Sequence, residues 1–377
     1  MLLLRRLQLP SPAENWMERR EFSFTLSGDI YIRYLSFKDH KELSRALEQK
    51  TPVKMDVGAV YNVNPAVARK GLAAMHPEER ELVFDIDMTD YDDVRTCCQG
   101  AEVCKMCWRF LAIACKILDR VLTSHFGFKH LLWVFSGRRG LHCWVCDEEA
   151  RCLSMDERAA IVEYLSLVDG GKFMTKKCRL DRQSVHHPLV RDALAVLDSP
   201  ADASGLTLFE KIVVEEQKQL ETPKQWRQWL CLCGSKLLME QISSAVEGKK
   251  KSLDKVRQMM GVCNKFEGTN GNNVGAYFMR EMKLQFCYPR LDVNVSKGLN
   301  HLLKSPFVVH PKTGRICVPF NPKHVDSFDP KAVPLVSHVV EGFEAGGKGD
   351  GKGCLASSLD LLEKFVASME SERLKKE

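Results

Sequence analysis

The sequence predicts a mixed α/β fold in which mixed sheets are flanked by helices and interrupted by an inserted helical subdomain. Alternation of apolar and polar residues predicts strands over 21–34, 54–61 and 82–88. Apolar residues at helical spacing predict a helix over 108–122, so strands and helices interleave along the chain. With 377 residues, 45% of them hydrophobic, the chain is long enough for one large mixed domain and a smaller one.

Composition limits the compartment and the partners. Fifteen cysteines without a secretory signal predict a reducing compartment, where thiols stay free or bind metal. The apolar start 1–4 is followed at once by two arginines, which is neither a signal-peptide core nor a membrane span, so we expect a soluble intracellular protein. The net charge of +6, from 55 basic and 49 acidic residues, permits nucleic-acid binding without requiring it.

The first element expected is a β-hairpin over 21–34 with its turn around Gly28. One face of this hairpin is apolar and includes Phe24. The opposite, polar face carries Glu21, Tyr31 and Arg33. The next strand, 54–61, repeats the alternation and directs Asp56 outward.

Two carboxylates follow one another on the strand expected over 82–88. Asp85 and Asp87 alternate with apolar residues, so both leave the same face of the strand, roughly 6.5 to 7 Å apart. Such a pair can hold two divalent cations for phosphoryl transfer, whereas the alternative is a solvated strand edge. A later strand expected over 291–295 directs Asp292 outward and offers a third carboxylate.

A basic turn joins two strands expected over 131–136 and 141–147. Two guanidinium groups between glycines suit phosphate oxygens, because the backbone can approach an anion and the planar forks match its geometry. The alternative is a solvated turn, but the nearby carboxylates favour phosphate binding. The candidate residues of this region are Ser136, Arg138, Arg139 and His142.

A cysteine motif over 97–107 precedes the helix expected at 108–122. Its four thiols belong to Cys97, Cys98, Cys104 and Cys107. Four thiols suit one tetrahedral zinc ion, and because four protein ligands leave no open position we expect a structural role. The alternative is that one of the two adjacent cysteines is a small apolar residue of the core.

The rest of the chain completes the organisation. From about residue 151 the pattern becomes helical and includes the lysine run 249–251, and strand character returns at 291–295 and 306–319. The expected parts are a core of 20–184 and 286–340, an inserted helical subdomain of 185–285, a flexible glycine-rich linker of 342–353, a C-terminal helix of 354–377 and an atypical N-terminal segment of 1–19. The C-terminal helix carries an apolar stripe that must pack against another element.

Taken in order, these motifs resemble the small, catalytic subunit of eukaryotic DNA primase, in the archaeo-eukaryotic primase superfamily. The resemblance departs at residues 1–19, where the family carries a longer helical segment. It covers most of the expected core, in 21–24, 31–34, 56–61, 83–93, the cysteine motif, 136–147 and 291–319.

The resemblance implies roles for the candidate residues. The ligands of two catalytic Mg²⁺ or Mn²⁺ ions would be Asp85, Asp87 and Asp292, and the four cysteines would hold Zn²⁺. The incoming nucleotide would be bound by Ser136, Arg138, Arg139 and His142, with Lys304 and His310 at its phosphates or sugar. Beside the site would lie Glu21, Tyr31, Arg33 and Asp56, the last as an acceptor for a ribose hydroxyl.

The resemblance also implies an activity and partners. The activity is DNA-dependent RNA primer synthesis from ribonucleoside triphosphates on a single-stranded DNA template, at replication initiation and on the lagging strand. The partners are a large iron–sulfur subunit and the DNA polymerase alpha complex, in the nucleus and without a membrane. Two alternatives stay open: a catalytically inactive nucleic-acid-binding scaffold subunit of the same fold, and a metal-dependent nuclease or phosphatase that transfers phosphoryl groups to water.

Overall fold

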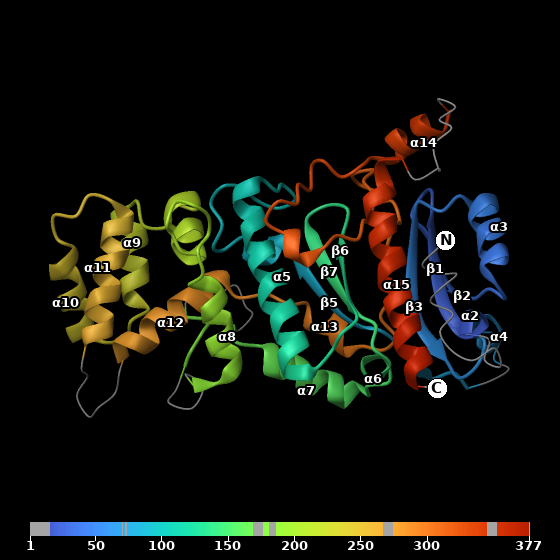
Figure 1. Cartoon of the computed structure of the whole chain (residues 1–377), viewed down its shortest axis with the longest axis horizontal. Coiled ribbons are helices and arrows are strands. Elements are labelled where there is room, and N and C mark those ends of the chain that lie inside the picture. Colours follow the sequence, from blue (N-terminus) through green and yellow to red (C-terminus); the bar gives the residue numbers. More distant parts are fainter. Residues whose placement is uncertain are drawn as a thin grey trace. The chain divides into compact units, whose positions relative to one another are not determined.

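The computed structural model describes residues 16–69, 71, 74–168, 176–180, 186–266, 274–344 and 353–376. Antiparallel sheets and many helices make up these residues (Figure 1), which confirms the predicted mixed α/β fold class. As far as it is described, the chain forms two units. Unit 1 contains Met1–Asp85, Phe126–Glu163 and Leu291–Glu377, and unit 2 contains Ile86–His125 and Tyr164–Arg290. The domain boundaries expected from the sequence stay a prediction.

The first sheet of unit 1 has the strand order β2-β1-β3-β4, with β8 also paired to β3. Its strands are β1 (Arg20–Leu26), β2 (Ile30–Leu35), β3 (Lys54–Tyr61), β4 (Pro77–Glu79) and β8 (Leu303–Lys304). The antiparallel pairing of β1 with β2 confirms the predicted hairpin, and β3 has the bounds that the sequence predicts. Because β8 comes from late in the chain, its pairing places Lys304 opposite Asp56.

Apolar side chains of the first sheet pack against helices α2 (Trp16–Arg19) and α3 (His40–Lys50). Phe24 and Met17, for example, are buried in the same apolar cluster. Asp39 caps α3, since its carboxylate accepts hydrogen bonds from two backbone N–H groups of the first turn. The sheet is therefore held by a core of its own.

The second sheet has the strand order β5-β7-β6. It consists of β5 (Leu82–Asp87), β7 (Gly140–Val145) and β6 (Leu131–Phe135). The antiparallel pairing of β6 with β7 confirms the predicted hairpin around the basic turn 136–140. The chain passes from unit 1 to unit 2 within β5, directly after Asp85.

Helix α15 (Ala356–Lys376) covers one face of the second sheet (Figure 1). Leu362 and Val366 of this helix are buried in the same cluster as Leu132 and Trp144 of the sheet. Burying each such aliphatic side chain contributes about 1.5 to 3 kcal/mol. The apolar stripe seen in the sequence thus packs on the face of β6 and β7.

Further helices of unit 1 are short. They are α4 (Pro65–Ala68), α6 (Glu148–Arg151), α7 (Met155–Leu165, whose last two residues belong to unit 2), α13 (Val293–Lys297), η5 (Pro322–His324), α14 (Val336–Glu344) and η6 (Gly353–Leu355).

Unit 2 is helical. Apart from the last two residues of β5 it contains η1 (Met88–Tyr91), all but the last residue of α5 (Lys105–Phe126), α8 (Pro188–Leu197), the π-helix η3 (Glu210–Glu216), α9 (Pro223–Cys231), α10 (Lys236–Val246), α11 (Ser252–Lys265) and α12 (Val274–Cys287). Helix α5 contains the predicted helix 108–122, and Gly127 follows its end with a φ of +73°, a backbone conformation that glycine adopts readily.

Two predicted strands are wrong. Residues 291–295 form no strand, because helix α13 begins in this stretch with Asp292 as its N-cap. The stretch 306–319 is not one strand either. It turns back on itself at 311–314, where proline and glycine occupy positions typical of a turn, and among the described residues a single isolated bridge, between Val309 and Ile316, joins its two arms.

Two expected segments lie largely outside the described residues. They are residues 1–15 of the predicted N-terminal segment and residues 345–352 of the predicted linker. In the part of the chain that the structure describes, no helix is both long enough and apolar enough to cross a membrane.

Candidate active site and metal centre

Strand β5 carries two of the predicted carboxylates on one face. Phe84 and Ile86 are fully buried, whereas Asp85 and Asp87 are half-buried, which is the alternation that the sequence predicts. Asp87 lies at the end of the strand and caps η1, because its Oδ1 accepts hydrogen bonds from the backbone N–H and the hydroxyl of Thr89, both at 2.8 Å.

The third carboxylate reaches the same region by a different route from the one predicted. The backbone N–H of Asp292 donates to the carbonyl oxygen of Asp85 at 3.1 Å. The side chain of Asp292 is exposed and accepts from the N–H of Asn294 at 3.0 Å, as the cap of α13. Ser296 fastens α13 to β5, since its hydroxyl donates to the Val83 carbonyl at 2.7 Å. Asp292 therefore lies beside Asp85 although no strand puts it there.

His142 lies on β7, the strand next to β5. Its Nε2 is 3.5 Å from Oδ1 of Asp85. Burial, aided by the nearby positive charge of Lys304 and by His310, lowers the pKa of His142 to about 3, so the ring is neutral at pH 7. Its Nδ1 is buried without a hydrogen-bond partner among the described residues. Such an orphaned polar atom fits a site that holds a ligand.

The basic turn 136–140 is closed by Ser136. The backbone N–H of Ser136 donates to the Gly140 carbonyl, and its hydroxyl accepts from the Gly140 N–H, both at 3.0 Å. Gly137 has a φ of +84°, and a Cβ added to it would lie 2.7 Å from Cβ of His310. The turn thus packs tightly against the turned-back stretch 306–319, called the late hairpin below, and leaves the side chains of Arg138 and Arg139 half-exposed.

His310 and Lys304 join this region from the late part of the chain. The hydroxyl of Thr313 donates to the Gly137 carbonyl at 2.7 Å, which ties the late hairpin to the basic turn. Burial lowers the pKa of His310 to about 4, with smaller contributions from the positive charges of Lys304 and Arg138. These cations and both neutral imidazoles therefore lie within electrostatic reach of one another.

Asp56 is buried, which corrects the prediction that it points outward. Its Oδ2 accepts a hydrogen bond from the Ser23 hydroxyl at 3.3 Å and lies 2.8 Å from Nζ of Lys54. Its Oδ1 is buried without a partner among the described residues. A carboxylate oxygen left over in this way fits an acceptor for a hydroxyl donor.

Glu21 is fully buried and organises the residues around it. It receives the Nε–H of Arg33 at 2.9 Å and the hydroxyl of Tyr61 at 3.1 Å. The hydrogen bond to Glu21 raises the pKa of Arg33, whose Nη2 also donates to the Asn300 carbonyl at 3.3 Å. Tyr31 differs, because its side chain is largely exposed on β2. Glu21 thus orients Arg33 and is not itself available to solvent.

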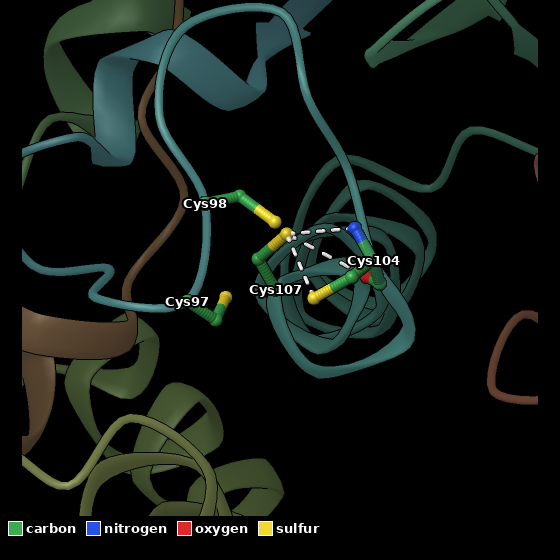
Figure 2. Close-up of side chains that lie close together, drawn as sticks. All are labelled: Cys97, Cys98, Cys104 and Cys107. Carbon is green, nitrogen blue, oxygen red and sulfur yellow. Dashed lines mark hydrogen bonds between the residues drawn. The ribbon is translucent and has the colours of Figure 1, made fainter.

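The four cysteines of the motif converge on one point in unit 2. Their sulfur atoms all lie within 4.8 Å of one another, and Figure 2 shows the side chains pointing toward a common centre at the start of α5. The Sγ atoms of Cys104 and Cys107 are 3.8 Å apart. Zinc bound tetrahedrally at about 2.3 Å from each sulfur requires sulfur pairs about 3.8 Å apart. The cluster therefore fits a zinc site, and Cys97 and Cys98 both belong to it.

Other groups donate hydrogen bonds to these sulfurs. The backbone N–H of Cys104 donates to Sγ of Cys107 at 3.2 Å, and Nε2–H of Gln217 donates to Sγ of Cys97 at 3.4 Å. Gln217 is fully buried, and its Oε1 accepts from the backbone N–H of Thr96 at 2.7 Å. Sequence reasoning missed Gln217, because nothing in a sequence links it to a motif more than a hundred positions earlier.

The structure brings some predicted residues together more closely than others. Among the described residues, the cysteines form the one group of three or more acidic, histidine or cysteine side chains that converges on a point. The three aspartates are instead spread along β5 and the start of α13.

Comparison with known proteins decides the family. The family profile described as DNA primase small subunit matches residues 84–322. The DNA primase small subunit of Drosophila melanogaster is 38% identical, with 90% of this chain and 78% of the relative covered. That of Caenorhabditis elegans is 40% identical, with 87% and 80% covered. The DNA primase small subunit PriS of Pyrobaculum calidifontis is 35% identical, with 54% of this chain and 65% of the length of PriS covered.

The chain belongs to the DNA primase small subunit family. The predicted resemblance and the predicted enzyme class, that of a primase, are thereby confirmed. The matched range of the primase profile begins one residue before Asp85 and contains the cysteine motif, the basic turn and both late residues, Lys304 and His310. Glu21 and Asp56 precede that range.

Proposed function

We propose that this chain makes RNA primers de novo on a single-stranded DNA template, by nucleotidyl transfer with two metal ions. The observation that carries the proposal is the meeting of Asp85, Asp292 and His142 in unit 1, within a primase small subunit. Two carboxylates beside a neutral buried imidazole suit metal-assisted chemistry on a phosphate ester. The biological setting, replication initiation and lagging-strand synthesis, follows from the family.

The metal ligands we propose are Asp85, Asp87 and Asp292, for Mg²⁺ or Mn²⁺. Carboxylate oxygens are the donors that these hard cations prefer, and all three side chains are at least partly exposed. When bound, such ions lower the pKa of an attacking hydroxyl and neutralise charge on the phosphates. The aspartates hold their positions through the caps that Asp87 and Asp292 make and through the bond between the backbones of Asp292 and Asp85.

Around the carboxylates, the polar groups suit a nucleoside triphosphate. Arg138, Arg139 and Lys304 supply positive charge for the phosphates, and the neutral imidazoles of His142 and His310 can donate hydrogen bonds to phosphate oxygens. A further donor is the hydroxyl of Ser136, which already accepts a hydrogen bond within the turn.

The sugar is the natural partner for Asp56. The unpartnered Oδ1 of Asp56 would accept a hydrogen bond from a ribose hydroxyl, which would remove the free-energy cost of a buried acceptor without a partner. We also assign Arg33, oriented by Glu21, and the exposed Tyr31 to the surroundings of the bound nucleotide. We also propose that the four cysteines hold one structural Zn²⁺ ion.

The proposed partners follow from the family alone. We propose that the chain assembles with a large iron–sulfur primase subunit and the DNA polymerase alpha complex in the nucleus.

The two alternative functions, a scaffold subunit and a nuclease, have weaker support. A catalytically dead scaffold would not need the three aspartates, and a nuclease acting on the DNA template would not need a buried acceptor suited to a ribose hydroxyl.

Primer synthesis by the full-length chain tests this function. The assay contains single-stranded DNA, ribonucleoside triphosphates and Mg²⁺ or Mn²⁺, with and without the large subunit. Asp85→Asn and Asp292→Asn should each abolish RNA synthesis, because an amide does not replace a carboxylate ligand. Asp29→Asn is the matched control, since Asp29 is exposed in a hairpin turn with a φ of +59° that asparagine tolerates.

Each competing result of this assay would indicate a different function. Loss of template would indicate a nuclease, and no product from the wild-type chain even with the large subunit would indicate a scaffold. Activity retained by Asp85→Asn would remove that residue from the site.

A further inference from the structure

The positive charge of the chain is concentrated in one helical part of unit 2. Residues 217–266 contain ten Lys or Arg and four Asp or Glu, so this stretch has a net charge of +6. The whole chain also has a net charge of +6, so the remaining residues are neutral in sum. The stretch contains helices α9, α10 and α11, coloured yellow-green to gold in Figure 1.

A hydrogen bond brings two lysine-bearing segments of this stretch together. The hydroxyl of Ser252, the first residue of α11, donates to the carbonyl of Leu220, just before α9, at 3.2 Å. Segments 218–224 and 249–255 therefore lie side by side although about 30 residues separate them in the sequence. These two segments carry six lysines, which together we call the lysine surface: Lys218, Lys224, Lys249, Lys250, Lys251 and Lys255.

Within the part of the chain that the structure describes, little neutralises the lysine surface. The six lysines are exposed except for Lys255, which is half-buried. Three exposed acidic residues accompany them, Glu221, Glu247 and Asp254. Among the described residues, the ion pair that involves these lysines is the one between Lys218 and Glu221, at 3.6 Å and exposed. A pair of that kind contributes at most about 1 kcal/mol.

The lysine surface has no role in the core of its own helices. Helices α10 and α11 pack through buried apolar side chains such as Ile242 and Met259. Gathering like charges at one end of these helices costs folding free energy, because unscreened lysines repel one another. An anionic ligand would remove that cost.

We propose that the lysine surface binds the phosphate backbone of single-stranded DNA. This inference rests on the proposed function, since a template must be held over more nucleotides than the active site contacts. Lysines act as flexible point charges and hold successive phosphates without reading sequence. Trp226 of α9, which is half-buried two positions after Lys224, offers in addition an aromatic ring for base stacking. That ring favours nucleic acid over an acidic peptide as the occupant.

The test measures binding of the full-length chain to a fluorescent single-stranded oligonucleotide, without nucleotides or divalent metal. The variant is Lys249→Ala/Lys250→Ala/Lys251→Ala. Each phosphate contact on a single strand contributes about 0.7 to the slope of log K against log salt concentration, so losing three should lower the slope by about 2. At about 0.1 M salt the same relation gives a loss of affinity of about one hundredfold.

A matched control removes three exposed lysines of unit 1, in the variant Lys41→Ala/Lys323→Ala/Lys331→Ala. It has the same change in net charge and should keep the wild-type slope. Equal effects of the two triple variants, or wild-type binding by the first, would overturn the inference, and thermal melting of both variants checks that they fold. The inference would also be overturned if the triple variant lost binding to poly-glutamate but kept binding to the oligonucleotide. Because the assay involves no catalysis, a wild-type chain inactive in primer synthesis would count against the proposed function and leave this result standing.

Discussion

Replacing Gly137 by alanine should damage both the stability of unit 1 and the binding of nucleotide. Gly137 sits in the basic turn with a φ of +84°. A Cβ there would lie 2.7 Å from Cβ of His310 and 3.1 Å from Sγ of Cys317. Neither neighbour can move freely, because His310 is buried at the turn and Cys317 belongs to the core of the second sheet.

The magnitude has two parts. A non-glycine residue with such a positive φ costs about 1 to 2 kcal/mol, and pushing packed neighbours aside costs about 1 to 3 kcal/mol more. Gly127 separates them, since it has a φ of +73° in the same unit and a Cβ there would meet nothing within 4 Å. Gly137→Ala should therefore lower the free energy of unfolding by about 1 to 3 kcal/mol more than Gly127→Ala does. In melting temperature this is a difference of about 2 to 12 °C.

Thermal melting and nucleotide binding of both variants make the assay. Gly137→Ala should also weaken binding of ribonucleoside triphosphates in the presence of metal, because shifting His310 and the basic turn displaces groups proposed to hold phosphate. Gly127→Ala should leave that binding at the wild-type level. Equal melting temperatures for the two variants would refute the packing argument, and unchanged nucleotide affinity in a destabilised Gly137→Ala would refute the place of the turn in the site.

Three further predictions concern the zinc centre, pH and the C-terminal helix. Gln217→Ala should weaken zinc binding about 10- to 100-fold in a chelator competition, because Cys97 loses its hydrogen-bond donor, whereas Gln228→Ala on the exposed side of α9 should not. The pKa of His310 is about 4 in the folded chain against an ordinary 6.5, so as pH falls the unfolded chain takes up this proton at a higher pH than the folded chain does. The free energy of unfolding should therefore decrease as pH falls from about 6.5 to 4, and urea unfolding of His310→Asn should show a smaller decrease over that range. Identical pH profiles for the two proteins would contradict this. Leu362→Ala should cost about 2 to 5 kcal/mol in unfolding, since this side chain is buried on the second sheet, and a loss below 1 kcal/mol would mean that α15 does not pack there.

Local patterns in the sequence predicted much of the site. The two carboxylates of β5 leave the same face because their neighbours Phe84 and Ile86 are apolar and buried, and a period of two is a property of any strand. The hairpin around the basic turn was predictable for a similar reason, since glycines flank the two arginines between apolar runs. The cysteine motif was predictable from spacing alone, because its ligands are close in the chain.

The strand predicted for the third carboxylate is wrong, although the backbone of Asp292 does lie beside Asp85. Leu291, Val293 and Val295 alternate with polar residues, which predicts a strand, but an aspartate followed by a short apolar stretch is equally able to cap a helix. The hydrogen bond from Ser296 to the backbone of β5 selects the helix. A contact with a residue more than 200 positions earlier cannot be read from local alternation.

The sequence by itself determined the fold class and most strands, because these depend on residue type and short-range spacing. Its motifs in order also gave the family resemblance that the comparisons confirm. Only the tertiary structure decided that Asp56 and Glu21 are buried, that Gln217 reaches Cys97 and that Lys304 lies opposite Asp56. Each of these depends on which distant segments pair, and pairing follows from the burial of whole faces and not from any one stretch of the chain.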